Sequence, residues 1–167
     1  MFCTVVRAAD AGVEQAPDGM DVRVLNRGQH GSMATFAFPA SSVGRAVRHW
    51  SVTELWYVLR GAATVWSAPC TPDGRAPDAG GGAGDPSADG QTVDLSAGDS
   101  LHIPAETAFQ LKVCDAGPFE AVAVTMPPWS GPHEALLVDG AWPVPAEDRV
   151  VSAPTLRAGG PADADAL

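Results

Sequence analysis

The residues of this chain best suited to chemistry are a histidine and a glutamate that lie five positions apart. His49 and Glu54 belong to the segment 47–61, in which an apolar run, 55–59, is soon followed by Gly61. Aromatic and β-branched residues that stop at a glycine are typical of a buried strand. An imidazole and a carboxylate at the start of such a strand can exchange a proton or bind a metal ion. They are the centre of the candidate site.

A second segment, 98–110, has the glycine-to-proline spacing of another unit of strand, turn and strand. Together, 47–61 and 98–110 resemble the two motifs of the cupin superfamily, with a resemblance that covers roughly 25–130. His49 matches the second histidine of the first motif, and Glu54 matches its glutamate. The resemblance implies an all-β fold, namely a single-domain, cupin-like double-stranded β-helix or jelly-roll barrel.

Both motifs are degenerate at their metal-ligand positions. Val47 stands where the first motif has its first histidine, and Phe109 stands where the second motif has its own. In the second motif Gly98 and Pro104 are retained, but Glu106 replaces the inner glycine. The resemblance therefore implies a damaged metal site, which could hold one divalent ion (Zn, Fe, Mn or Ni) or none.

A mononuclear metal enzyme usually needs three protein ligands and one open position. Beside His49 and Glu54, the first candidate for a third ligand is His102, because its strand lines the pocket in the proteins that this chain resembles. Gln110 is the second candidate, although strict alternation with Phe109 would turn it away. Without a metal, His49 could act as a general base whose tautomer is set by Glu54, with His102 as a third catalytic group.

Strand alternation directs several large side chains into the interior of such a barrel. Aromatic walls would bind an apolar or aromatic substrate and exclude water. The candidate substrate-binding residues are Arg45, Trp50, Trp56, Trp66, Phe109 and Gln110. An inward Arg45 could hold a carboxylate or enolate of the substrate, whereas an outward Arg45 would be a surface charge.

The elements that must position these residues are short strands separated by turns. Alternation and turn signals predict strands at 22–25, 33–38, 43–50, 54–59, 64–66, 91–95, 98–104, 109–114 and 119–126. We expect an N-terminal arm or edge strand at 1–24, a barrel at 25–146 and a disordered tail at 147–167. Within the barrel, 69–90 consists almost entirely of Gly, Ala, Pro, Asp and Ser, which predicts a flexible insertion.

The segment that follows the last predicted strand begins at Thr125 and is rich in proline. It is similar to the tail of many small single-domain cupins. We expect it to wrap across a sheet, with Trp129 and Trp142 as anchors.

The bulk composition bounds the class of protein. The 167 residues are 46% hydrophobic and include 18 Gly and 15 Pro, which suits one all-β domain. A net charge of −10 disfavours nucleic acid and anionic membranes as partners. The cysteines, Cys3, Cys70 and Cys114, are odd in number and far apart, and no signal peptide or membrane span is evident. These features predict a cytoplasmic protein.

Together these features favour a small-molecule enzyme of specialised metabolism that works by acid/base or metal-assisted proton transfer. Cyclases, isomerases, dehydratases and decarboxylases all need that chemistry. One alternative is a non-catalytic cupin that binds a small ligand. Another is a metal-dependent dioxygenase, against which the histidines missing at positions 47 and 109 argue. The resemblance also implies a homodimer formed through N-terminal strands within 1–38.

Overall fold

The computed structural model describes residues 2–70 and 90–145, which form two β-sheets. The first sheet contains β1 (Glu14–Gln15), β2 (Asp21–Arg27), β3 (Ser32–Phe38), β5 (Thr53–Arg60), β8 (Ser100–Ile103) and β10 (Phe119–Met126). The second contains β4 (Val47–His49), β6 (Ala62–Pro69), β7 (Gln91–Ser96), β9 (Thr107–Val113) and β11 (Ala135–Leu137), and a 3₁₀ turn, η1 (Pro132–Glu134), precedes β11. Most of the expected insertion at 69–90 and all of the expected tail at 147–167 lie outside the described residues.

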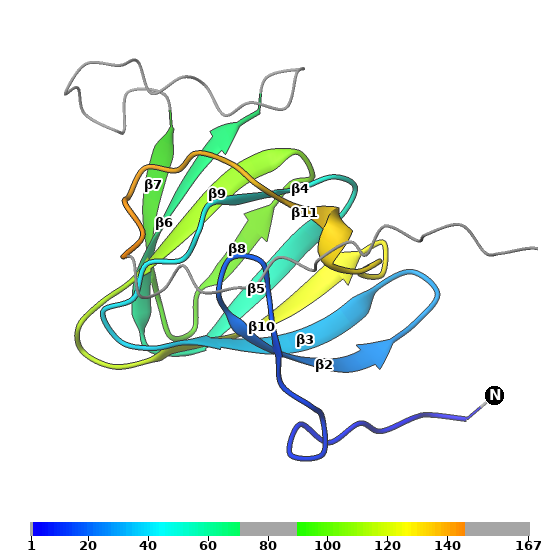
Figure 1. The fold of residues 1–167 in the computed structure, drawn as a ribbon. Helices are drawn as coiled ribbons and strands as arrows, with labels where there is room; N and C mark the ends of the chain where they lie inside the picture. The colour runs from blue at the N-terminus through cyan, green and yellow to red at the C-terminus, as the bar shows by residue number, and fades with distance from the viewer. Residues whose placement is uncertain (1, 71–89, 146–167) are drawn as a thin grey trace, which may run out of the picture.

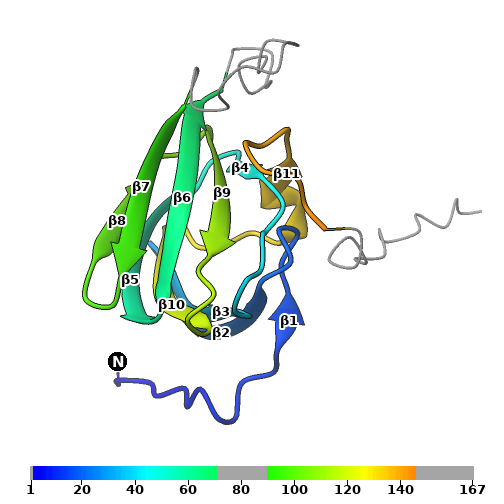
Figure 2. The ribbon, with the colours of Figure 1, turned by 90° about the vertical axis from the view of Figure 1, so that its left-hand side faces the viewer.

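Strands that are neighbours in space are distant in the sequence. The strand order is β1-β2-β3-β10-β5-β8 in the first sheet and β11-β4-β9-β6-β7 in the second, and the chain changes sheet at each connection from β3 to β6 and again from β7 to β11 (Figure 1). Figure 2 shows the strands of both sheets surrounding a common interior. Antiparallel strands that alternate between two facing sheets make a jelly roll, so the expected fold class is confirmed.

The N-terminal part of the chain extends the first sheet. β1 pairs with β2, and β2 pairs with β3, all antiparallel. The expected division between an arm at 1–24 and a barrel at 25–146 therefore falls within β2. The turn between β1 and β2 runs beside the interior of the barrel, which becomes important for the site below.

The core lies between the sheets and follows the alternation of the strands. On β5, Glu54, Trp56 and Val58 are buried, whereas Leu55 and Tyr57 face outward. This is the pattern of a strand with one face against a core. The indole of Trp56 packs on two other aromatic rings, with centroid distances of 4.6 Å to Phe36 and 5.7 Å to Phe109. These contacts hold the strand that carries Glu54 in a fixed position.

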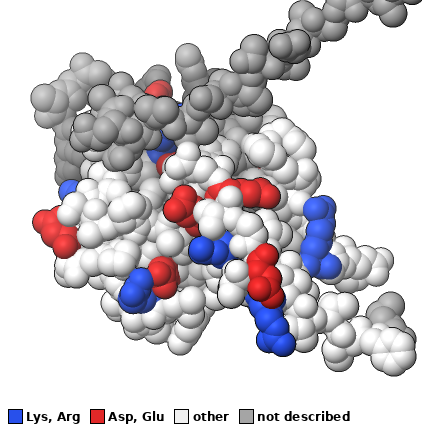
Figure 3. Space-filling model, turned by 60° about the horizontal axis from the view of Figure 1, so that its bottom comes forward, with Lys and Arg blue, Asp and Glu red and all other residues white. Residues whose placement is uncertain are grey.

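The surface carries both signs of charge in spite of the acidic composition. Figure 3 shows acidic and basic side chains mixed over one face, with uncharged surface between them. Arg60 and Glu120, on the neighbouring strands β5 and β10, form an exposed ion pair of this kind. Pairs so exposed add little stability. Among the described residues, no helix has the length and apolar character needed to span a membrane.

Candidate functional site

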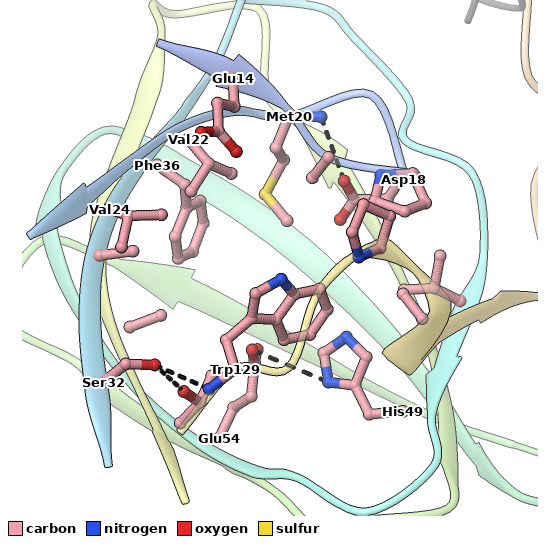
Figure 4. Close-up of a pocket in the computed structure, with 18 of the residues that line it drawn as sticks. Glu14, Asp18, Met20, Val22, Val24, Ser32, Phe36, His49, Glu54 and Trp129 are labelled. Carbon is pink, nitrogen blue, oxygen red and sulfur yellow. Dashed lines mark hydrogen bonds and ion pairs between the residues drawn. The ribbon is translucent and has the colours of Figure 1, made fainter. Parts of the chain in front are cut away.

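A cavity of about 320 Å³ lies against the inner face of the first sheet, between β2, β3 and β5 and the segment 129–135 (Figure 4). Its walls are mostly apolar. They include Met20, Val22, Val24, Ala34, Phe36, Val47, Trp56, Phe109, Ala123 and Trp129. Its polar side chains include the imidazole of His49, the carboxyl groups of Glu14, Asp18 and Glu54, and the hydroxyls of Ser32 and Thr125. Such a size and lining suit a small organic molecule.

His49 and Glu54 meet at one end of this cavity because they flank a short connection between the sheets. His49 ends β4 of the second sheet, and Glu54 follows the first residue of β5. Both are buried, with 6% and 7% of their surfaces exposed. His49 Nδ1 lies 3.7 Å from Glu54 Oε1, beyond hydrogen-bond distance, and has no hydrogen-bond partner among the described residues. The two groups therefore face each other without binding each other.

Burial moves the pKa values of this pair in opposite directions. Burial lowers the pKa of His49 to about 4, and the negative charge of Glu134 opposes this only in part. Burial raises the pKa of Glu54 to about 7; the hydrogen bond from Trp56 Nε1, at 2.7 Å, opposes the rise, and the charge of Asp18 adds to it. Near pH 6 the pair is thus a neutral imidazole facing a neutral carboxylic acid, and not an ion pair. Environments that separate two pKa values in this way assign the acid and the base.

The ring of His49 is held between two aromatic side chains. It contacts Phe109 and Trp129 edge-on, at centroid distances of 5.3 Å and 5.2 Å. The backbone N–H of Trp129 donates to Ser32 Oγ at 2.9 Å, and Ser32 Oγ lies 2.6 Å from Thr125 Oγ1. Figure 4 shows Trp129 within the cavity, beside both His49 and Glu54. Trp129, expected only as an anchor on a sheet, thus forms part of the cavity wall.

The connection between β4 and β5 is clamped by a carboxylate from η1. Glu134 accepts hydrogen bonds from the backbone N–H groups of Ser51 and Val52 and from the hydroxyls of Ser51 and Ser130. Burial raises the pKa of Glu134, but these hydrogen bonds outweigh it and lower the pKa overall. An ionised Glu134 therefore fixes the peptide that separates His49 from Glu54.

Three residues expected in the site lie elsewhere. His102 is exposed and pairs with the outward-facing Leu55, so it offers neither a third metal ligand nor a third catalytic group. Trp50 is 53% exposed, with the guanidinium of Arg48 4.6 Å from its ring centroid. Arg45 donates from its guanidinium to the carbonyl oxygen of Pro17. These three residues are absent from the cavity wall.

Trp66 and Gln110 were also expected in the site but belong to a second buried cluster, on the other face of the second sheet. Trp66 packs there with Ala68 and Ala108, under 138–142. Gln110 Nε2 donates to the carbonyl oxygens of Gly44 and Trp142, and its Oε1 accepts from the N–H of Trp142. Of the candidate substrate-binding residues, only Trp56 and Phe109 line the cavity with His49 and Glu54.

Sequence reasoning missed the contribution of the turn between β1 and β2. Asp18 is buried at the cavity wall, although its neighbours Pro17 and Gly19 indicated only a turn. A turn signal does not say which way its polar side chain points. Glu14 and Met20 reach the cavity from the same turn region.

The donor atoms of the cavity do not meet the needs of a metal site. No group of three His, Cys, Asp or Glu side chains suited to a metal ion occurs in 2–70 and 90–145. His49 and Glu54 provide two ligands, and one oxygen of Glu54 already accepts from Trp56. The donors of the described residues therefore do not fit a three-ligand site.

Comparison with known proteins gives structural neighbours but no match in sequence. No protein-family model and no curated protein matches the chain. KdgF from Halomonas sp. has a TM-score of 0.58 at 14% identity, over 77% of this chain and 97% of its own. Oxalate decarboxylase from Lactobacillus farciminis, in a formate complex, has a TM-score of 0.59 at 15% identity, and that from Bacillus subtilis at pH 4.6 has 0.61 at 12%.

Both decarboxylase alignments cover 82% of this chain, which spans 37% and 32% of those longer chains. Identities so low establish the fold and leave the reaction open. The neighbours are cupin-fold proteins, and their two facing antiparallel sheets match those described above. This chain therefore has the cupin fold, as the two degenerate motifs predicted.

Proposed function

We propose that this protein is a small-molecule enzyme that moves protons between two positions of an apolar or aromatic substrate. Glu54 is the general acid and His49 the general base. One observation carries the proposal: two buried groups whose pKa values are shifted in opposite directions stand 3.7 Å apart at the wall of a largely apolar cavity, and Nδ1 of the imidazole has no hydrogen-bond partner among the described residues. A buried polar atom without a partner is costly and calls for an explanation. Transfer of a proton to and from this imidazole provides one.

The simplest reaction that this pair supports is isomerisation of a carbonyl compound through its enol. The imidazole of His49 takes the proton from a carbon beside the carbonyl, and the electrons of that C–H bond form the new C=C bond. The carbonyl π electrons take the proton of Glu54, which leaves an imidazolium beside a carboxylate. In the second step the imidazolium returns its proton to another carbon of the conjugated enol, and Glu54 regains the hydroxyl proton. Both groups end as they began.

The surroundings suit each half of this cycle. The charges that appear midway are opposite and close, so they attract each other strongly in a buried setting. The rings of Trp129 and Phe109 pack edge-on against the imidazole and lower the polarity around it, which strengthens its electrostatic interactions with a bound substrate. Cyclisation, dehydration and decarboxylation use the same acid and base, and the product formed decides among these classes.

The test is exchange of substrate hydrogens with deuterated water, followed by NMR. The probes are aryl ketones with acidic α-hydrogens, with and without an amino group. We expect exchange by the native protein and a loss of about 10²- to 10⁴-fold in His49→Ala and in Glu54→Gln, the usual contribution of general acid–base catalysis. The matched control is His102→Ala, which removes an exposed imidazole and should leave the rate unchanged.

Two results would contradict the proposal. One is the absence of exchange with every ketone of the panel. The other is equal exchange by His49→Ala and the native protein, which would leave a small-ligand-binding protein as the better description. Binding would then appear as thermal stabilisation without turnover.

A further inference from the structure

The charges on the cavity wall are unevenly distributed. The wall includes three carboxyl side chains, Glu14, Asp18 and Glu54, and one cationic side chain, Arg27. Asp18 and Glu54 are each 7% exposed, whereas Arg27 is exposed at the end of β2. Solvent screens an exposed guanidinium, so it compensates buried carboxylates poorly. The interior therefore has an excess of negative groups.

The carboxyl group of Asp18 makes few hydrogen bonds with the described residues. Its Oδ1 accepts from the backbone N–H of Met20 at 3.1 Å, and no described side chain donates to it. The positive charge of Arg45 lowers its pKa slightly, but the Arg45 guanidinium donates to Pro17 instead of to this carboxyl. In Figure 4, Asp18 stands at the wall across the cavity from Glu54.

Two buried carboxyl groups in one cavity disfavour each other's ionisation. Burial raises the pKa of Asp18 to about 6, and the charge of Asp18 contributes to the raised pKa of Glu54. At pH 8 both are largely ionised. A cation in the cavity would relieve this repulsion and give Asp18 the charged partner that the protein does not provide.

The remaining walls suit the rest of such a ligand. Trp129, Phe36 and Phe109 present aromatic rings to the cavity. Aromatic rings attract a nearby ammonium group and also pack against an apolar body. At the far end, the cavity is lined by His49 and Glu54, whose buried side chains lie 3.7 Å apart.

We propose that the cavity takes an aromatic or apolar amine, whose ammonium group pairs with Asp18 while its apolar body extends toward His49 and Glu54. The amine defines the substrate class, and this part rests on the proposed function. Recognition of the ammonium group depends only on the cavity.

Calorimetry at pH 8 with three probes of similar size tests the inference. The probes are 2-phenylethylamine, 2-phenylethanol and 3-phenylpropionate, which differ mainly in charge. We expect the amine to bind at least about tenfold more tightly than the other two, as a charge-assisted hydrogen bond provides. Asp18→Asn, which can still accept from Met20, should remove that preference and leave binding of the alcohol unchanged. Asp21→Asn, at an exposed aspartate of β2, is the matched control and should keep it.

A pH series on the native protein makes the test independent of whether Asp18→Asn folds. The ammonium group stays charged from pH 8 to pH 5, whereas Glu54 becomes protonated near pH 7 and Asp18 near pH 6, so the part of the change that occurs near pH 6 reports on Asp18. Affinity for the amine should therefore fall over this range while affinity for the alcohol stays constant. Equal affinities for amine and alcohol at pH 8, an undiminished preference in a folded Asp18→Asn, or an affinity for the amine that does not change with pH would each overturn the inference.

The outcomes separate this inference from the proposed function. Amine-selective binding without hydrogen exchange in any aryl ketone would leave the ammonium site standing and remove the proton-transfer role. Exchange of neutral ketones without amine selectivity would support the proton-transfer role and remove the ammonium site.

Discussion

Two buried polar side chains on opposite faces of the second sheet differ in whether their hydrogen-bonding groups have partners. Gln110, on the outer face, makes three hydrogen bonds and ties Trp142 to the sheet. His49, on the inner face, has a buried Nδ1 with no partner among the described residues. Trp66 Nε1 and Arg48 Nε share that lack of a partner, but His49 alone of the three lines the cavity, opposite Glu54. A satisfied polar group stabilises one structure, whereas an unsatisfied one costs stability. The difference separates a structural residue from a candidate catalytic one, although both were candidates for the same site.

The largest effect on stability should come from the outer face. Gln110→Leu leaves the N–H of Trp142 and two carbonyl oxygens without partners, which should lower the free energy of unfolding by about 4 kcal/mol. Urea unfolding measures this as a lower midpoint at unchanged slope. A change near zero would show that 138–142 does not depend on Gln110, and the comparison would fail.

A smaller effect, dependent on pH, is expected for the acid of the pair. The folded-state pKa of Glu54 is raised from 4.5 to about 7, so its contribution to stability is fully present below pH 4.5 and is lost as the pH rises through 7. The side chain introduced by Glu54→Gln is neutral at every pH, so the variant does not lose stability in this way as the pH rises. Relative to the native protein, the variant should therefore gain about 3 kcal/mol of stability between pH 4.5 and pH 8. Thermal melts across this range measure the gain, and parallel curves for the two proteins would contradict it.

The opposite sign is expected for the base. The folded-state pKa of His49 is lowered from 6.5 to about 4, so the native protein keeps its full stability above pH 6.5 and loses it as the pH falls toward 4. His49→Leu has no proton to take up and no hydrogen bond to lose. At pH 5 the variant should be about 2 kcal/mol more stable than the native protein, and at pH 8 about equal. Lower stability of His49→Leu at both pH values would mean that the imidazole is structural after all.

The sequence predicted the strands and the part of the site that they carry. Alternation on one strand placed Glu54 and Trp56 on the same inward face, and the structure agrees. The same rule predicts that His102 faces outward, because its apolar neighbours Leu101 and Ile103 are the residues that would face the core. In the structure both neighbours are more buried than His102. In that case the family resemblance outweighed a simpler local argument, and the local argument was right.

The rest of the site depended on contacts that no local pattern encodes. Asp18 and Trp129 come from connections between strands, whose path is set by tertiary packing. The segment after Thr125 was expected to wrap across a sheet with Trp142 as an anchor, and 138–142 does cover the cluster of Trp66; the sequence did not indicate which sheet face it would cover, so Trp66 was expected in the barrel. The strands themselves and the inward face of β5 were thus predictable, whereas the facing of Trp66, His102 and Gln110 and the residues on connections were not.

The peptide that runs from Trp129 to Glu134 has a consequence for how this site could change. Trp129 shapes the cavity wall, and Glu134, five residues later, holds the connection that aligns His49 with Glu54. A substitution that widens the wall at Trp129 will also loosen the alignment of the two reacting groups. Substrate range and turnover are therefore tied together in one short peptide. Attempts to broaden the substrate range should therefore begin with the cavity-lining side chains of β2 and β3. Smaller side chains there would widen the cavity without disturbing the alignment of His49 with Glu54.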